Sequence, residues 1–138
     1  MGFDIATQAA KMGAEVVLIS GPTHLQIDPT QVTLVPVVSA QEMYDACHQY
    51  YNAMDVAIAA AAVADYRPKN IAQQKIKKED ATLSLNLEKT DDILASLGKQ
   101  KTKQFLIGFA LETENEIENA KLKIQKKNLD LIVLNSLQ

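Results

Sequence analysis

The sequence predicts an α/β domain with a mostly parallel, doubly wound, Rossmann-like sheet between two layers of helices, three layers in all. Apolar runs of strand length, such as residues 15–20, alternate along the chain with amphipathic segments of helical period. The 138 residues suffice for one domain with a sizeable core. We therefore expect a single domain over residues 1–138.

Each expected element rests on a local signal. Ser39 to Glu42 is a capping box that opens a helix, and Thr90 or Asp91 caps another. The helix that starts at Thr113 carries glutamates early and lysines late, which suits the helix dipole. The expected helices cover residues 4–12, 39 to about 50–53, 92–97 and 113–127, and the expected strands cover residues 15–20, 32–35, 55–62, 83–87, 104–110 and 129–134.

Two of these strands have a predicted place in the sheet. The apolar run 55–62 is long enough to lie in mid-sheet. Leu83, Leu85 and Leu87 alternate with polar residues, which predicts a half-buried edge strand. Between them, residues 66–80 are charged and without period, and a loop of this length inside a compact domain is usually functional.

Composition excludes several classes of protein. The net charge of −3 argues against a nucleic-acid-binding surface, and no apolar run is long enough to span a membrane. The N-terminus lacks a secretory signal, and the single cysteine, Cys47, allows no internal disulfide, so we expect a cytoplasmic protein. We expect Cys47, His24 and His48 to be packing or surface residues, because none lies in a nucleophile or metal-ligand motif.

The strongest functional signal is the run from Ala59 to Pro68, where a strand passes into small residues and ends at Asp65. Small residues let a ligand approach the backbone, and a carboxylate can hydrogen-bond a sugar or organise a metal. Three lysines, Lys75, Lys77 and Lys78, follow and supply charge for a polyphosphate. Open α/β folds bind ligands at the carboxyl ends of strands, so we expect a nucleotide site here.

The glycines argue against other nucleotide-binding classes. The chain has no G-x-G-x-x-G and no G-x-x-x-x-G-K-S/T sequence. A nicotinamide reductase of the short-chain type is therefore disfavoured, and a folded fragment that binds nucleotide without turnover stays open as a non-enzymatic alternative.

The chain resembles the phosphopantothenate–cysteine ligase family (phosphopantothenoylcysteine synthetase), which in many bacteria is the C-terminal half of a bifunctional flavoprotein of coenzyme A biosynthesis. The matches occur in the expected order along nearly the whole chain. They are Met1-Gly2-Phe3, Leu18 to Pro22, Ala59 to Pro68, Lys75 to Lys78, Gly108 to Thr113 and Lys126 to Val133. In the family a strand and a phosphate-binding loop precede this region and a ligand-contacting loop follows it, so we expect a chain truncated at both ends.

The resemblance implies a reaction and its participants. The substrates are 4′-phosphopantothenate and cysteine, CTP or ATP is the co-substrate, and Mg²⁺ is required. FMN is expected only if a decarboxylase half is attached. No nucleic acid or membrane partner is implied, and the family forms homodimers, with a higher oligomer expected in a bifunctional parent.

The resemblance also implies roles for individual residues. Lys75 is the expected catalytic residue, Asp65 is a possible metal contact, and the start of the helix at residues 91–94 is expected to read the base. This chain has Asp91 where the family often has proline. The expected nucleotide-binding residues are Ala59, Ala60, Ala61, Asp65, Lys75, Asp91, Asp92, Ile93, Leu94, Phe109, Lys123 and Lys127, and the expected supporting residues are Gly2, Lys77, Lys78 and Asn135.

Two of these residues raise a geometric difficulty. Lys123 and Lys127 share one face of their helix. Lys123 lies ~15 Å along that helix from Thr113, so reaching a site at the helix start requires an unusual sheet arrangement or a partner subunit.

Overall fold

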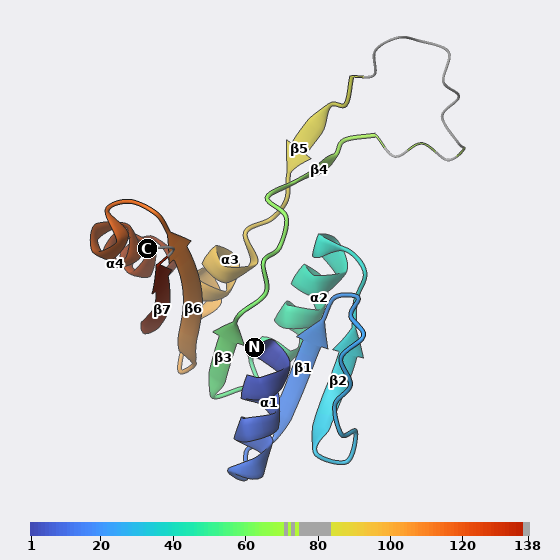
Figure 1. The fold of residues 1–138 in the computed structure, drawn as a ribbon, viewed down its shortest axis with the longest axis vertical. Helices are drawn as coiled ribbons and strands as arrows, with labels where there is room; N and C mark the ends of the chain where they lie inside the picture. Colours follow the sequence, from blue (N-terminus) through green and yellow to red (C-terminus); the bar gives the residue numbers. More distant parts are fainter. Residues whose placement is uncertain (71, 73, 75–83, 137–138) are drawn as a thin grey trace.

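The computed structural model describes residues 1–70, 72, 74 and 84–136. Within these residues the chain forms an α/β fold, as the sequence predicts (Figure 1). The helices are α1 (Gly2–Lys11), α2 (Ala40–Tyr51), α3 (Ile93–Gln100) and α4 (Glu116–Lys127). The strands are β1 (Val16–Ser20), β2 (Val32–Pro36), β3 (Val56–Ala59), β4 (Tyr66–Pro68), β5 (Leu87–Lys89), β6 (Phe105–Glu112) and β7 (Leu131–Ser136).

The central strands pair in parallel, which confirms the predicted fold class. β1 pairs with β2, and a second group has the order β3-β6-β7. The arrowheads of β1, β3 and β6 point toward the same end of the molecule (Figure 1). α3 lies between β3 and β6 in the chain and α4 between β6 and β7, as expected for crossover units of a Rossmann-like domain, whereas residues 21–31 join β1 to β2 without a helix.

The main core lies on one face of the β3-β6-β7 group. Its buried members are Tyr51 of α2, Leu97 of α3, Leu106 of β6 and Leu129, and the side chain of Leu106 is 0% exposed. Ile124 of α4 packs against them. Residues of α2, α3 and α4 therefore cover this face together.

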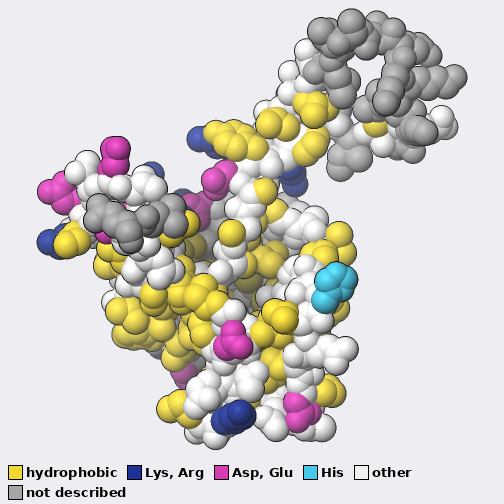
Figure 2. All heavy atoms as spheres, in the orientation of Figure 1, with side chains coloured by type: hydrophobic (Ala, Val, Ile, Leu, Met, Phe, Trp, Pro, Cys, Tyr) yellow, Lys and Arg dark blue, Asp and Glu magenta, His cyan; other side chains and the backbone are white. Residues whose placement is uncertain are grey.

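The opposite face of the same strands keeps large apolar side chains exposed. Side chains point to alternate faces along a strand, and the residues that alternate with the core positions lie open. Val56 is 52% exposed, Phe105 46% and Leu131 46%. Figure 2 shows hydrophobic side chains gathered over this part of the molecule. The helices of the described residues thus bury the β3-β6-β7 group mainly from one side.

One predicted strand is shorter than expected and occupies a different position. The run 55–62 was expected in mid-sheet, but β3 ends at Ala59 and pairs only with β6 among the described residues. Alanine has a low preference for strands, and the chain leaves the ladder within the alanine run. The prediction of a mid-sheet strand is therefore wrong for the described part of the chain.

The predicted edge strand is also placed differently. β5 pairs with β4 in an antiparallel ribbon that projects from the body as an arm (Figure 1). Leu85 is 62% exposed and Leu87 56%, so neither is half-buried, and Leu83 lies outside the described residues. Alternating apolar residues fit a free ribbon as well as a sheet edge. The start of the expected loop, Tyr66–Pro68, is a strand.

The last predicted helix begins later than its sequence signal. β6 continues to Glu112, and Asn115 adopts a left-handed conformation with φ 47° before α4 begins at Glu116. Asn tolerates this conformation better than most residues. The expected helix start at Thr113 is therefore wrong by one turn. α3, conversely, runs on to Gln100.

Candidate nucleotide site

The alanine run and β6 lie side by side at the candidate site. The parallel register places Ala59, the last residue of β3, beside Gly108 of β6. Phe109 follows Gly108 and is half-buried. Two segments that the sequence marked separately, the Ala59 strand end and the Gly108-Phe109 pair, are therefore neighbours.

Thr90 ties the end of the alanine run to the start of α3. Its N–H donates to the Asp65 carbonyl at 3.0 Å, and its hydroxyl donates to the Ala64 carbonyl at 2.6 Å. Asp65 is exposed, with its carboxylate free to face solvent. These two bonds hold Asp65 beside the turn that leads to Asp92.

The start of α3 is built by Asp92. Its carboxylate caps the helix by accepting from the Ala95 N–H at 2.9 Å. Ile93 and Leu94 pack against the hydrophobic core, while Asp91 is exposed. The start of α3, here called the corner, thus presents the carboxylates of Asp91 and Asp92 and the free backbone N–H groups of a helix start at the surface.

Lys127 reaches this corner from α4. Its ammonium group lies 2.8 Å and 3.0 Å from the two carboxylate oxygens of Asp92. Burial raises the pKa of Asp92, but the hydrogen bonds from Lys127 and from Ala95 and the charges of Lys127 and Lys123 outweigh it, so the pKa lies below its ordinary value. Asp92 is therefore a carboxylate at neutral pH, and it partly neutralises Lys127.

Both α4 lysines contact segments of the candidate site within one chain. Lys123 donates to the carbonyl of Phe109 at 3.4 Å. α4 can lie this close because Gly98 of α3 meets its backbone: a Cβ on Gly98 would lie 1.9 Å from the Lys127 carbonyl oxygen. The close crossing of α3 and α4 brings Lys127 to Asp92, and Lys123 reaches β6 directly from α4.

A shallow hollow lies at the carboxyl ends of β1 and β2. It measures about 280 Å³ and is lined mostly by small and apolar groups. Ala61, an expected nucleotide contact, lies there, since residues 61–64 form one wall and the start of α2 forms another. The lining residues are Gly21, Val37, Val38, Ser39, Ala40, Met43, Ala61, Ala62, Val63 and Ala64.

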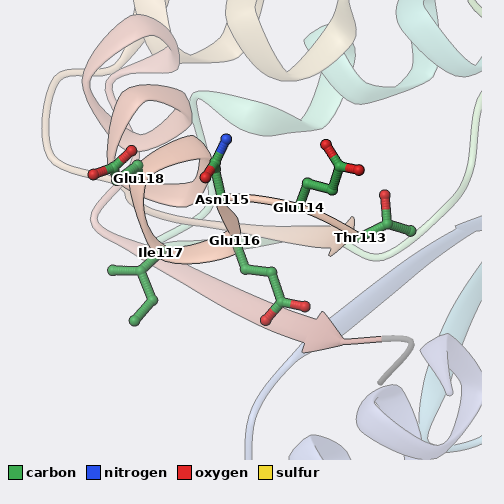
Figure 3. A pocket seen from close by; sticks show the side chains of 6 residues that line it. All are labelled: Thr113, Glu114, Asn115, Glu116, Ile117 and Glu118. Carbon is green, nitrogen blue, oxygen red and sulfur yellow. The ribbon is translucent and has the colours of Figure 1, made fainter.

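A second hollow, of about 320 Å³, surrounds the turn between β6 and α4. Its carboxylates do not converge on one point (Figure 3). Across the described ranges, no group of three or more His, Cys, Asp or Glu side chains is arranged to hold a metal ion. This turn is acidic and disfavours a polyphosphate. Its lining residues are Thr113, Glu114, Asn115, Glu116, Ile117 and Glu118.

Two of the remaining expected site residues lie in β7 and at the start of α1. Lys75, Lys77 and Lys78 lie outside the described residues. Asn135 pairs with Leu111 in the β6-β7 ladder, and Gly2 opens α1, a helix that packs on β1 and β2. Their assignment stays a prediction.

Sequence reasoning missed the residues that connect the site. The sequence marks Thr90 only as a helix cap, and no pattern singles out Gly98 or Ser96. A glycine inside a helical segment, as at Gly98, is the one available signal of close packing. The packing role expected for Cys47 agrees with its half-buried place against the core, where burial raises the pKa of the thiol.

Fold and site together define a Rossmann-like α/β domain whose polar corner lies at the carboxyl ends of parallel strands, where such folds bind nucleotides. The chain belongs to the family described as the DNA/pantothenate metabolism flavoprotein C-terminal domain, since the model of that family matches residues 1–138.

Relatives extend over most of this chain. It is 44% identical over 138 residues to "Coenzyme A biosynthesis bifunctional protein CoaBC" of Bacillus subtilis, covering 100% of this chain and 34% of the relative. It is 48% identical over 139 residues to a protein of an unknown prokaryotic organism named "Cysteine/Cysteine sulfinic acid decarboxylase", covering 100% of this chain and 39% of the relative. The chain thus spans little more than a third of these relatives.

Solved structures resemble the whole fold. The C-terminal domain of a coenzyme A biosynthesis bifunctional protein CoaBC is 48% identical, with a TM-score of 0.84 over 96% of this chain and 62% of that chain. The DNA/pantothenate metabolism flavoprotein from Streptococcus pneumoniae has a TM-score of 0.83 at 22% identity, over 99% of this chain and 69% of that chain, and supports the fold.

Proposed function

We propose that this chain forms the ligase part of an enzyme that joins 4′-phosphopantothenate to cysteine in coenzyme A biosynthesis, with a nucleotide as co-substrate. The observation that carries the proposal is the corner where Lys127 contacts Asp92 and Lys123 contacts the Phe109 carbonyl, beside the strand end at Ala59. Family membership and the CoaBC relatives support the same function.

The proposed reaction has two steps. The carboxylate of 4′-phosphopantothenate attacks the α-phosphorus of CTP, and the bond to pyrophosphate breaks, leaving an acyl-cytidylate. The amine of cysteine then attacks the acyl carbon, loses a proton to solvent, and releases CMP. Such a site works by holding charged reactants in place and by stabilising the charge of the departing pyrophosphate.

Each group of residues has a proposed task. Lys123 and Lys127 contact the triphosphate, Phe109 packs on the nucleotide, and the start of α3 reads the pyrimidine edge. Lys75 stabilises the reacting phosphate, with Lys77 and Lys78 in support. The backbone of Ala59, Ala60 and Ala61 lies against the nucleotide, and Gly2 and Asn135 support the site from α1 and β7.

Mg²⁺ would bind with the triphosphate. Mg²⁺ is usually held by one or two carboxylates together with substrate phosphates, and it neutralises phosphate charge. Asp65 fits this role because its side chain is exposed beside the α3 corner, whereas the Asp92 carboxylate already contacts Lys127. FMN belongs to this proposal only if a decarboxylase half is attached.

The first test is calorimetric titration of the chain with CTP and then ATP in the presence of Mg²⁺. We expect tighter binding of CTP, and at least tenfold weaker binding by Lys127→Ala, which removes a charge from the corner. Lys121→Ala is the matched control, because Lys121 is exposed on the same helix. Equal binding by both variants would contradict the assignment of Lys127. Binding of CTP without any turnover would favour the non-enzymatic alternative.

Lys75 is tested by product formation in the intact parent protein. Lys75→Ala is expected to abolish formation of phosphopantothenoylcysteine while the far-ultraviolet circular dichroism stays unchanged. Lys11→Ala, on an exposed position of α1, is the control for loss of one lysine. Turnover at the rate of the unsubstituted protein would remove Lys75 from the mechanism.

The proposed assembly is a homodimer that forms through the β4-β5 arm. The arm exposes Tyr66 by 53%, Leu87 by 56% and Leu85 by 62%. A two-stranded ribbon is marginal in water by itself, so a second copy that covers these side chains would stabilise it. Light scattering at tens of micromolar is expected to give a dimer, and Leu87→Glu a monomer. Met12→Glu, at an exposed position outside the arm, is the control.

The proposed setting is the cytoplasm, with small-molecule substrates and without a nucleic-acid or membrane partner. In the part of the chain that the structure describes, no helix has the length and apolar character needed to cross a bilayer.

A further inference from the structure

A hydrogen-bonded cluster outside the proposed ligand contacts joins α2 to α3. The Ser96 hydroxyl lies 2.9 Å from the Tyr44 hydroxyl and 2.9 Å from Nε2 of His48. The rings of Tyr44 and His48 stack, with centroids 4.0 Å apart and planes at 22°. All three side chains are half-buried, so this cluster, here called the α2-α3 latch, is partly shielded from water.

The partners of the latch fix the direction of its bonds. Nδ1 of His48 lies 2.8 Å from the Tyr44 carbonyl, which can only accept, so Nδ1 carries a proton. In the neutral imidazole Nε2 then accepts from the Ser96 hydroxyl, and Ser96 accepts from the Tyr44 hydroxyl. If His48 is protonated, both hydroxyl bonds can reverse, so the latch persists in either state.

The two helices that the latch joins carry different parts of the proposed site. α2 contacts β1, and its first residue, Ala40, lines the hollow at the carboxyl ends of β1 and β2. α3 contacts α4, and its cap, Asp92, meets Lys127. No ladder bond joins the β1-β2 pair to the β3-β6-β7 group within the described residues. Contacts between α2 and α3 therefore help to set the spacing between the β1-β2 pair and the β3-β6-β7 group.

Ser96 stands one helical turn from the corner. Its N–H donates to the Asp92 carbonyl at 2.9 Å, while the Asp92 carboxylate accepts from Ala95 and Lys127. A side chain fixed at Ser96 thus restrains the turn that presents Asp92 to the proposed nucleotide.

We infer that Ser96 is a positioning residue, held by Tyr44 and His48, that fixes the start of α3 relative to the hollow and so sets nucleotide affinity at the Asp92–Lys127 corner. The inference rests on the proposed function only for the identity of the ligand, a nucleotide. The geometry of the α3 start is a property of the protein without nucleotide.

The test compares Ser96→Ala with Gln100→Ala. Gln100 makes a side-chain bond from α3 to the residue that follows α2, donating to Asn52 at 2.9 Å, and lies one turn further from Asp92. Two quantities are measured for each variant: the hydrogen-exchange rate of the Ala95 amide by NMR, and the dissociation constant for CTP with Mg²⁺. Thermal unfolding gives the stability of each variant.

For Ser96→Ala we expect Ala95 exchange and the CTP dissociation constant both to rise by about 3- to 10-fold, the effect of losing roughly one net hydrogen bond. Ser96→Thr keeps the hydroxyl and is expected to restore both. Gln100→Ala is expected to leave the exchange rate and the dissociation constant unchanged, even if it lowers the unfolding temperature as much as Ser96→Ala does.

Unchanged Ala95 exchange in Ser96→Ala, or an equal rise in Gln100→Ala, would overturn the inference. If the unsubstituted chain binds no CTP, the proposed function fails, and the Ala95 amide still decides whether Ser96 positions α3. Faster Ala95 exchange with an unchanged CTP affinity would also overturn it, because the positioning would then have no effect on the site.

Discussion

At the scale of single residues, three polar groups illustrate how neighbours set a side chain's role. Asp92 is kept ionised at the corner by Lys127, and burial keeps the Cys47 thiol protonated. Tyr51 is different, since its side chain is buried but its hydroxyl has no hydrogen-bond partner in the described structure. An unpaired buried hydroxyl costs free energy.

Tyr51→Phe is therefore expected to stabilise the protein. The substitution removes the unpaired hydroxyl and keeps the ring in the core, so the free energy of unfolding should rise by about 1 kcal/mol. Urea unfolding measures this free energy. Tyr44→Phe, which removes a hydroxyl that is bonded to Ser96, is the control and should lower the same quantity. A loss of stability in Tyr51→Phe would mean that the hydroxyl is bonded in solution.

A second residue-scale prediction concerns acid. The N–H of Leu106, at 2.7 Å, and the ammonium group of Lys101 hold the pKa of Asp130 below its ordinary value. A carboxyl whose folded pKa is lowered contributes stability above its unfolded pKa of about 3.9 and loses that contribution as pH falls through the lower, folded pKa. Asp130→Asn should therefore lower the unfolding temperature at pH 7 and have little effect near pH 2.

The matched control for acid is Asp55→Asn. Asp55 pairs with Lys103 but is 85% exposed, and exposed ion pairs contribute little. The unfolding temperature of the Asp55→Asn variant should equal that of the unsubstituted protein at pH 7 and at pH 2. An effect of Asp130→Asn that is as large at pH 2 as at pH 7 would show that the carboxylate charge is not the cause.

At the scale of elements, the site depends on how closely α3 and α4 cross. Gly98 has no room for a Cβ against the Lys127 backbone, and Asn128 donates to the Gly98 carbonyl at 2.9 Å. Asn128 ends α4 in a left-handed conformation with φ 52°, which brings its side chain back toward α3. The crossing therefore brings Lys127 within reach of Asp92.

Gly98→Ala tests this crossing. The added methyl group would meet backbone rather than a movable side chain, so we expect a loss of about 1–3 kcal/mol in the free energy of unfolding. Gly2→Ala is the matched control, because it lies in a helix with no atom near the added Cβ, and alanine favours a helix. Equal stability of Gly98→Ala and the unsubstituted protein would show that the helices can separate without cost.

At the scale of the whole molecule, the stabilising core lies on one face of the β3-β6-β7 group. Leu106 is fully buried under α2 and α3, whereas Phe105, its neighbour in β6, is 46% exposed on the other face. The two residues are neighbours in one strand, and their side chains point to opposite faces of the sheet.

Leu106→Ala is therefore expected to cost about 2–5 kcal/mol in the free energy of unfolding. Phe105→Ala should cost less than half as much, although phenylalanine is the larger side chain. Denaturant unfolding of both variants measures the difference. Equal losses would mean that both faces of the sheet are covered in solution.

The sequence by itself determined the class of fold and the segments of the site. Apolar runs alternating with amphipathic segments predict parallel strands joined by helices, and the capping box at Ser39 predicts the start of α2, because these signals depend on neighbours along the chain. The run from Ala59 to Asp65 stands out for the same reason, whereas Asp91 to Leu94 and Phe109 are indicated by the resemblance to the ligase family. Their assignment as nucleotide contacts stays a prediction.

Only the tertiary structure decided which of these segments meet. Neither the contact of Lys127 with Asp92, 35 residues apart, nor that of Ser96 with His48, 48 apart, has a local signal. The first depends on the α3-α4 crossing that Gly98 permits, and the second on the packing of α2 against α3. The pairing of β5 was wrongly predicted because alternation fixes which side chains share a face and leaves open which strand lies beside it. Local pattern determines an element, whereas packing between elements determines its neighbours.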